Sequence, residues 1–284
     1  MTLGRGARLA LRIATAIVLV FIYVPLTLVV IYAFNESGTS AWPPSGFTLD
    51  WVKAALDNTG LQEAFLTSIV VALCATGVAM LLGALASLAV ARYSFFGRET
   101  VSFVLVLAIA LPGVVTGMAL STAMAWFHAP LGFFTIVVGH ATFCIVLVYN
   151  NAIARLRRIS SSLEEASADL GADGFQTFRH VTFPALRSAF VAGGLLAFAL
   201  SFDEVIVTLF MAGGVKTLPI WIFQSFRLAN QVPLVNVAGL VAILLSVIPV
   251  YFATRLSGGV VGARLNGSRI QEVGQRSPDT GPTT

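Results

Sequence analysis

Charged residues are scarce in this chain. Only 11% of its 284 residues are Asp, Glu, Lys or Arg, whereas 57% are hydrophobic. An ordinary soluble domain carries about 25% charged residues, so these few charges cannot cover a water-exposed surface. The mean hydropathy is +0.88, and the apolar residues occur in long uncharged runs. The composition therefore excludes a soluble enzyme, a disordered chain and a secreted disulfide scaffold, and it indicates an all-α protein that spans a bilayer.

Cysteine is also scarce, and the common signatures of enzymes are missing. Cys74 and Cys144 both lie in apolar runs, without the CxxC spacing or the number that a metal site or a disulfide framework needs. The sequence has no GxxxxGK[ST] loop for ATP and no HExxH or GxSxG motif of a membrane hydrolase. We therefore expect no enzyme activity, no metal and no cofactor, and the energy for any active process must come from elsewhere.

Six stretches are apolar and long enough to cross the hydrocarbon core, which takes about 20 residues of helix. The predicted spans are Ile13 to Phe34, Ala64 to Val90, Val101 to Phe127, Leu131 to Ala152, Ser188 to Phe210 and Pro233 to Thr254. We therefore predict a short N-terminus (1–12), a six-span transmembrane domain (13–254) and a tail (255–284). Because the tail is rich in Gly, Ser and Arg and has few apolar residues, we expect it to be disordered.

The basic residues are distributed unevenly between the two sides of the predicted bundle. If all six stretches cross, 14 of the 17 Lys and Arg residues lie on the side of both termini, and only Lys53, Lys216 and Arg227 lie on the other. Basic loops are retained on the cytoplasmic face, so both termini and the long loop over 153–187 are expected to be cytoplasmic in a multi-pass inner (plasma) membrane protein. This placement explains the pI near 9.4. We expect contact with membrane lipid and none with nucleic acid.

The 153–187 loop has the pattern of two short helices separated by a glycine. Ser161 with Glu164, or Ser162 with Glu165, has the spacing of a capping box that begins the first helix. Gly171 can adopt the left-handed conformation that ends it. The sequence therefore predicts a compact helix-turn-helix unit on the cytoplasmic side.

The second half of the loop carries its own cap and stop signal. Asp173 can cap the second helix together with Gln176, and Pro184 is expected to close the unit before the next span. Apolar residues are interspersed with the charges of both helices, namely Leu163, Ala166, Leu170, Phe175 and Phe178. A partner protein explains such residues better than water does.

The spacing within this loop resembles the EAA loop of ABC importer permeases. That pattern reads E-A-A, three residues, G, nine residues, I, any residue, L-P. The residues that match it are Glu165, Ala166, Ser167, Gly171 and Pro184. The chain departs from the pattern with Ser167 for Ala, Val181 for Ile and Phe183 for Leu, which are conservative in size or polarity. The alternative is an ordinary cytoplasmic loop that matches by chance.

The resemblance implies the type I ABC importer permease fold, with the EAA loop docked in a groove of a cytoplasmic ATP-hydrolysing subunit. It further implies a second, homologous permease subunit, two ATPase subunits and a periplasmic solute-binding protein as partners. The stretches 139–144, 201–208 and 217–221 resemble the spermidine/putrescine type of these permeases. The expected function is thus ATP-driven import of a small cationic solute, a polyamine.

Two carboxylates fall within the fifth predicted span. Because an ionisable group in a membrane is costly, Asp203 and Glu204 are candidate functional residues. Ser201, Glu204 and Thr208 follow i, i+3, i+7 spacing and are expected to form a polar stripe on this helix. Asp203 is expected to point about 100° away from Glu204. We expect one carboxylate to face a translocation cavity and attract a cation, and the other to face a partner helix or the cavity wall. The alternatives are a packing or gating network without substrate contact, and a stand-alone, proton-coupled secondary transporter.

Overall fold

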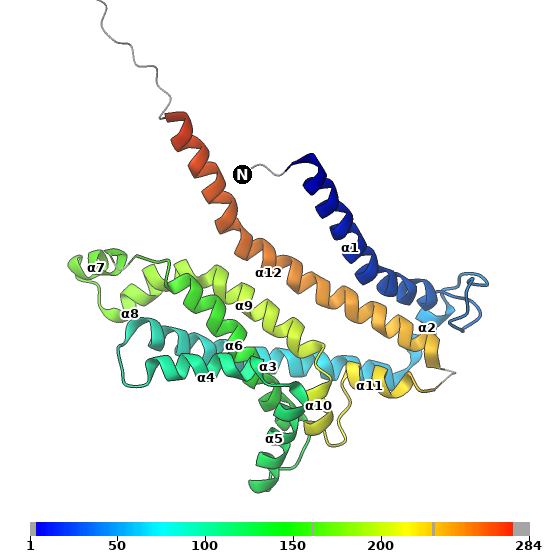
Figure 1. Ribbon diagram of the computed structural model, residues 1–284. Helices are drawn as coiled ribbons and strands as arrows, with labels where there is room; N and C mark the ends of the chain where they lie inside the picture. Colours follow the sequence, from blue (N-terminus) through cyan, green and yellow to red (C-terminus); the bar gives the residue numbers. More distant parts are fainter. Residues whose placement is uncertain (1–3, 161, 229–230, 275–284) are drawn as a thin grey trace, which may run out of the picture. The chain divides into compact units, whose positions relative to one another are not determined.

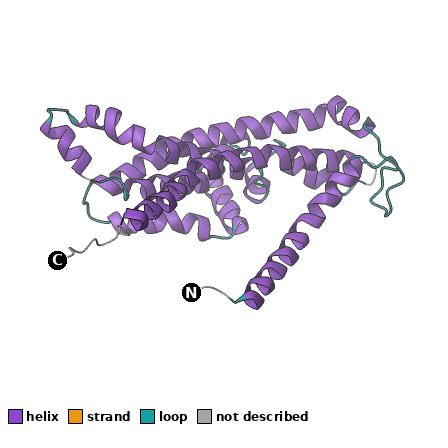
Figure 2. Cartoon of the chain, turned by 90° about the horizontal axis from the view of Figure 1, so that it is seen from above, coloured by secondary structure: helices purple, strands orange, loops and turns teal. Residues whose placement is uncertain are grey.

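The computed structural model describes residues 4–160, 162–228 and 231–274, and every regular element in these ranges is a helix (Figures 1 and 2). The expected all-α class is therefore confirmed. The elements are α1 (Arg5–Ala33), α2 (Asp50–Asp57), α3 (Thr59–Arg92), α4 (Arg98–Ala110), α5 (Gly113–Trp126), α6 (Phe133–Leu156), α7 (Ser162–Asp169), α8 (Gly174–Thr177), η1 (Phe178–Thr182), α9 (Phe183–Phe202), α10 (Ile206–Met211), α11 (Leu218–Ser225) and α12 (Val232–Gly274).

Five helical segments are long and apolar enough to cross a bilayer, and α4 with α5 makes a sixth if this bent pair is one span. The apolar segments are Gly6–Ala33, Thr59–Arg92, Phe133–Leu156, Gly174–Phe202 and Val232–Leu256. They correspond to the first, second, fourth, fifth and sixth spans expected from the sequence. The most apolar part of α1 has none of its residues buried, as is typical of a helix that lipid or another chain surrounds.

The third expected span is bent rather than straight. α4 and α5 meet at an angle of 110° across a short break at Leu111 and Pro112. Leu111 has extended backbone angles, φ −74° and ψ 137°, as expected for a residue whose helical conformation is opposed by the following proline ring. Pro112 also has no N–H to donate to the preceding turn. The hydropathy of the stretch 101–127 does not reveal this break.

The described chain divides into two compact units, each of which has its own packing. The first comprises Met1–Val71, Gly117–Ile136 and Phe202–Ser246, and the second comprises Ala72–Thr116, Val137–Ser201 and Val247–Thr284, as far as the structure describes them. In the first unit, the buried Asn35 organises the segment after α1. Its Nδ2 donates to Ser37 Oγ (2.9 Å) and to the Thr39 carbonyl (2.7 Å), and its Oδ1 accepts the backbone N–H of Ser45 (3.2 Å).

In the second unit, glycines bring three helices into close contact. A Cβ at Gly83 in α3 would lie 2.9 Å from both the Ile145 carbonyl oxygen and Val148 Cβ in α6. A Cβ at Gly193 in α9 would lie 3.1 Å from Val148 Cα, and one at Gly194 would lie 3.0 Å from a methionine sulfur in α3. Larger side chains would separate these backbones, so α3, α6 and α9 pack tightly within this unit.

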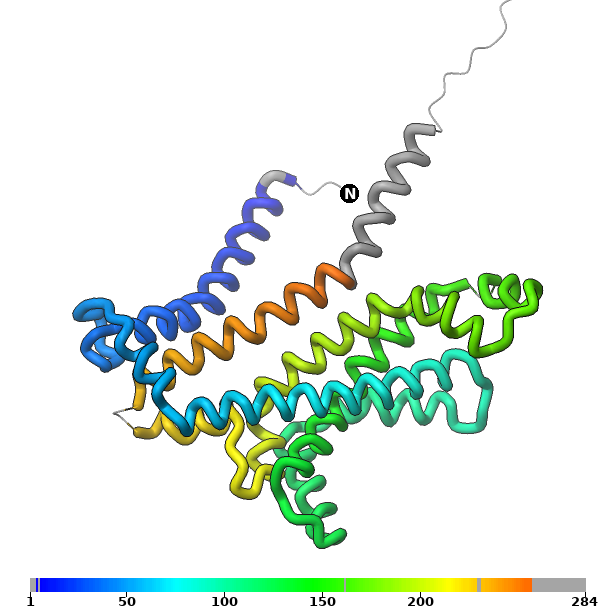
Figure 3. Tube along the Cα trace, turned by 180° about the vertical axis from the view of Figure 1, so that it is seen from behind, coloured from blue at the N-terminus to red at the C-terminus, as the bar shows by residue number. Residues whose placement is uncertain are grey.

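The turn over 93–97 reverses the chain, so that α4 runs back alongside the end of α3 (Figures 1 and 3). The Ser102 hydroxyl of α4 lies 2.8 Å from the Tyr149 hydroxyl of α6.

Helix α12 continues to Gly274, through the first part of the tail that we expected to be disordered. An established helix extends at little cost because its nucleation has already occurred. The rest of the tail, 275–284, lies outside the described residues.

Candidate functional site

The loop between α6 and α9 folds as short helices joined at a glycine. α7 ends at Asp169, and Gly171 follows with φ +83°, in the left-handed region that glycine adopts without a steric penalty. The Asp173 side chain accepts the backbone N–H of Gln176 at the start of α8, and the Gln176 side chain accepts the backbone N–H of Asp173. The glycine turn and this capping box, both predicted from the sequence, are confirmed.

The residues that match the EAA pattern differ in exposure. Glu165, Ala166 and Gly171 are exposed, whereas Ser167 is half-buried. The Ser167 hydroxyl lies 3.0 Å from the Thr177 hydroxyl of α8 and joins the two short helices. An alanine, which the family pattern has at this position, could not make this hydrogen bond. The departure at Ser167 therefore adds a contact inside the loop and leaves the exposed residues free for another chain.

Large apolar side chains of the loop also face outward. Leu163 is 55% exposed, Leu170 is 89% exposed and Phe175 is 69% exposed. Together with Glu165 and Ala166 they form the surface that we call the loop face. Exposed apolar residues of this kind, interspersed with charged residues, are typical of protein interaction sites.

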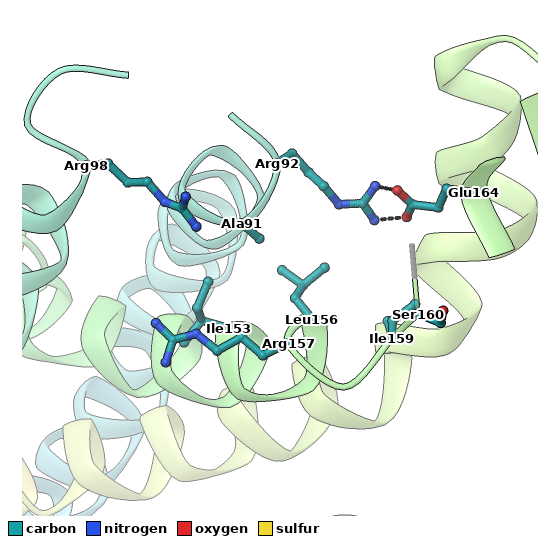
Figure 4. A pocket seen from close by; sticks show the side chains of 9 residues that line it. All are labelled: Ala91, Arg92, Arg98, Ile153, Leu156, Arg157, Ile159, Ser160 and Glu164. Carbon is teal, nitrogen blue, oxygen red and sulfur yellow. Dashed lines mark hydrogen bonds and ion pairs between the residues drawn. The ribbon is translucent and has the colours of Figure 1, made fainter. Parts of the chain in front are cut away.

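A polar cluster that the sequence analysis missed ties α7 to the end of α3. Both guanidinium Nη atoms of Arg92 contact the carboxylate of Glu164 (Figure 4). Thr182 in η1 donates to Glu164 Oε1 at 2.8 Å, and Arg92 Nη2 donates to Thr182 Oγ1 at 3.3 Å. The Thr182 side chain is buried. Three elements, α3, α7 and η1, therefore meet in one closed hydrogen-bonded triangle, which we call the Arg92 cluster.

Sequence spacing gave no indication of the Arg92 cluster because its members are 72 and 90 residues from Arg92 along the chain. Glu164 was a candidate for a capping box with Ser161, which lies outside the described residues. In the structure, the Glu164 carboxylate turns to Arg92 and Thr182 instead. The available signal was a basic residue at the C-terminal end of a span, a position from which an arginine can reach a neighbouring loop.

Pro184 does not end the helical structure of the loop, contrary to expectation. Helical backbone continues from α8 through η1, which is a π-helix, into α9, whose second residue is Pro184. A proline in a helix has no N–H and its ring crowds the carbonyl four residues earlier. The wider π-helical turn immediately before Pro184, in which the Phe183 N–H bonds to the Phe178 carbonyl, is a known way to adjust such a helix. The second half of the loop is thus an extension of α9.

The two acidic residues of the fifth predicted span lie in a break between helices. α9 ends at Phe202, and Asp203, Glu204 and Val205 separate it from α10. The Glu204 carboxylate accepts the backbone N–H of Val207 at 2.9 Å and so caps the start of α10. Because the start of α10 is capped, the chain can begin a new helix there instead of continuing α9. The expectation of one straight helix from Ser188 to Phe210 is therefore wrong.

Ser201 and Thr208, which flank the break, are both buried, and each has a partner of its own. The Ser201 hydroxyl lies 2.8 Å from Nδ1 of the buried His140 in α6. The Thr208 hydroxyl donates to the Glu204 carbonyl at 2.8 Å. Because the chain leaves the helix between them, the predicted stripe of Ser201, Glu204 and Thr208 along one helix face is also wrong.

The geometry separates the two carboxylates. Glu204 is half-buried and has a backbone partner, as described above. Asp203 is exposed and makes no hydrogen bond or ion pair with any residue that the structure describes. A carboxylate without a protein partner is available to a cation from outside the chain, whereas a capping carboxylate is already engaged.

The far end of α10 is also fixed. The buried Thr135 hydroxyl donates to the Met211 carbonyl at 2.7 Å, and the Gly132 backbone N–H donates to the same carbonyl at 3.1 Å. Gly213, which follows α10, has φ +56°, and a Cβ there would lie 2.6 Å from the Leu131 carbonyl oxygen. Only glycine fits so close an approach. Helix α10 therefore has defined contacts at both ends.

These features define a multi-span membrane transport subunit with an exposed helical loop, and comparison with known proteins identifies its family. Residues 79–266 match the family described as binding-protein-dependent transport system inner membrane component. The chain is 34% identical over 218 residues to the putrescine transport system permease protein PotI of Escherichia coli K12, which covers 73% of this chain and 76% of that protein. It is 31% identical over 232 residues to the spermidine/putrescine transport system permease protein PotC of Haemophilus influenzae, covering 81% and 89%.

A solved structure has the same fold. The chain superposes with a TM-score of 0.67, at 14% identity and over 90% of its length, on 96% of a chain from the bacterial alginate ABC transporter in complex with alginate pentasaccharide-bound periplasmic protein. This chain therefore belongs to the family of binding-protein-dependent transport system inner membrane components. The expected permease fold, the multi-pass location in the inner membrane and the assignment as a transport subunit rather than an enzyme are confirmed.

Proposed function

We propose that this permease subunit imports a polyamine, or a small cation like it, with energy from ATPase subunits that bind the 153–187 loop. The relatives PotI and PotC are named for putrescine and spermidine transport, and the chain is similar to them over most of its length. The observation that carries the substrate assignment is Asp203, an exposed carboxylate without a partner among the described residues, at a helix break next to an apolar span.

Coulomb attraction gives this assignment a physical basis. An ammonium group 4 Å from a carboxylate gains about 4 kcal/mol at an effective dielectric constant of about 20, before the cost of desolvation. A polyamine presents several ammonium groups to such a site, and an anion would be repelled by it. Asp203 is thus the carboxylate that meets the cation, and Glu204 fixes the start of α10 beside it.

The orientation and the assembly belong to the same proposal. Residues 1–12, the 153–187 loop and the tail from 255 face the cytoplasm, because 14 of the 17 basic residues then lie on that side. The loop face docks against one of two ATPase subunits, with Glu165 at its rim. A second, homologous permease subunit completes the translocation path, and a periplasmic solute-binding protein delivers the cation.

Uptake of labelled putrescine by cells that express the complete transporter tests the role of Asp203. We expect Asp203→Asn to lower uptake at least about tenfold, equivalent to about 1.4 kcal/mol, with a normal amount of assembled complex. Removing an exposed charge that has no partner among the described residues leaves none of those residues unsatisfied, so folding is not expected to suffer. Uptake equal to that of the wild type would reject the substrate role of Asp203.

Glu204→Gln is the matched control, since it removes the neighbouring negative charge but keeps an oxygen that can accept the Val207 N–H. We expect it to retain most of the uptake. A Glu204→Ala variant also removes the cap, which costs about 0.5–2 kcal/mol, and is expected to lower the amount of assembled complex. If Glu204→Gln abolishes transport and Asp203→Asn does not, the two roles are reversed.

A further inference from the structure

Helix α7 has no buried apolar packing that would fix its position. None of its residues is buried, so no apolar core anchors it to the spans. Its hydroxyl contact through Ser167 reaches only α8, which belongs to the same loop. The Arg92 cluster is different because it connects α7 to the end of a membrane-spanning helix. The side chains of Arg92 and Glu164 are 31% and 20% exposed, so water surrounds them only in part.

The cluster has a geometry that resists rotation. Two guanidinium nitrogens of Arg92 contact the two oxygens of Glu164, and this paired arrangement is directional as well as attractive. Thr182, buried at the base of α9, supplies a third contact to each partner. A single ion pair at a surface leaves the relative orientation of its two elements variable. Hydrogen bonds among three side chains from three elements restrict that orientation.

Glu164 also balances positive charge in its surroundings. A pocket of about 180 Å³ next to the cluster is lined by three arginines, Arg92, Arg98 and Arg157, and Glu164 is the one carboxylate among the described residues that line it. Figure 4 shows Arg92 and Glu164 facing each other, with Arg98 and Arg157 apart from this pair. Loss of the Glu164 charge would therefore leave Arg92 among like charges, with the uncharged Thr182 hydroxyl still in contact.

We propose that the Arg92 cluster is the joint that passes the movement of α7 into the membrane helices during the ATPase cycle. α7 carries Glu165 on the loop face, and Arg92 ends α3, which packs through Gly83 against α6 and through Gly194 against α9. A displacement of α7 is therefore passed to the parts of α3, α6 and α9 that pack together in the second unit. This inference rests on the proposed docking of the loop face, but it assigns to Arg92, Glu164 and Thr182 a positioning role that docking does not require.

Transport coupling provides the first test. The assembled complex, purified with co-expressed ATPase subunits and reconstituted with its binding protein, is assayed for ATP hydrolysis and for uptake of labelled putrescine. We expect Glu164→Gln and Arg92→Gln to hydrolyse ATP and retain the ATPase subunits, yet to move about tenfold or more fewer solute molecules per ATP. Asp169→Asn, a change to an exposed carboxylate of the same helix, is the matched control and is expected to behave as the wild type.

The charge-swapped variant, Arg92→Glu combined with Glu164→Arg, shows whether the pair itself is responsible. The Thr182 hydroxyl can donate or accept, so it is compatible with either arrangement. We expect the swap to recover a substantial part of the transport lost in each single variant. A wild-type ratio of transport to ATP hydrolysis in both single variants would overturn the proposed role of the Arg92 cluster. So would a charge-swapped variant that recovers no transport.

A second measurement does not depend on the transported solute. Spin labels on Ala168 in α7 and Leu85 in α3 report the distance between these helices in the assembled complex, with and without an ATP analogue. We expect a distance that the analogue leaves unchanged in the wild type and a broad, analogue-dependent distribution in Glu164→Gln. An analogue-dependent distance in the wild type would reject the joint. A wild-type complex that keeps a fixed distance but transports no polyamine would refute the polyamine assignment and leave the role of the Arg92 cluster supported.

Discussion

Replacement of Gly171 by valine provides the sharpest test of the loop. Gly171 has φ +83°, and no atom of the described residues lies within 4 Å of the position that a Cβ would occupy. The substitution therefore adds no clash with neighbouring groups, and its cost is the backbone strain of a β-branched residue in the left-handed region. This strain is about 1–3 kcal/mol, enough to reduce the population of the turn by roughly five- to 150-fold if the loop relaxes to another conformation.

We expect Gly171→Val to insert in the membrane normally but to lose uptake and co-purification of the ATPase subunits. Gly97 offers a matched control, because it has φ +84° in the turn before α4 and likewise has nothing within 4 Å of a Cβ. Gly97→Val carries the same strain outside the loop face and is expected to retain the ATPase subunits. Normal uptake by Gly171→Val, or equal losses in both variants, would refute the argument that this turn shapes the docking surface.

Three further predictions concern orientation and packing. In a cysteine-free background, a cysteine at Trp42 should react with an impermeant reagent in intact cells and one at Gly171 should not; the opposite pattern would reverse the orientation. Asn35→Ala leaves the partners of its amide unpaired, at a cost of about 1–3 kcal/mol, and should make the segment after α1 sensitive to protease in membrane preparations. Gly83→Val should prevent stable folding because its side chain meets α6, whereas Gly77→Val, where a Cβ has open space, should be tolerated; equal yields of the two proteins would contradict the packing.

The sequence was most informative where local chemistry decides the structure. The turn at Gly171 and the capping box of Asp173 depend on residues within one helical turn of each other, so their pattern is visible in the sequence. The spans are recognisable because apolar content over about 20 residues is itself the physical requirement for crossing a bilayer. The EAA pattern combines local turn signals with a position between two apolar spans, and this combination indicated the permease family.

Three features could not be predicted in this way. A hydropathy average does not register the two residues Asp203 and Glu204, although they lie in the break between α9 and α10, where the Glu204 carboxylate accepts the Val207 N–H. The contact between Arg92 and Glu164 depends on tertiary proximity, which spacing along the chain does not encode. Pro184 was expected to stop a helix, but a π-helical turn accommodates it, and this compensation depends on the backbone of the preceding five residues.

The end of α9 has a consequence for the field around Asp203. The last carbonyl groups of a helix have no partners within it, and their aligned dipoles act like roughly half a negative charge at the C-terminus. α9 has 20 residues and no basic residue in its last turn, so no side chain of that turn offsets this charge. Asp203 follows directly after it, which places backbone and side-chain negative potential at the same point. A cation at the break is therefore attracted in part by the peptide groups, and that part survives any substitution of the carboxylate.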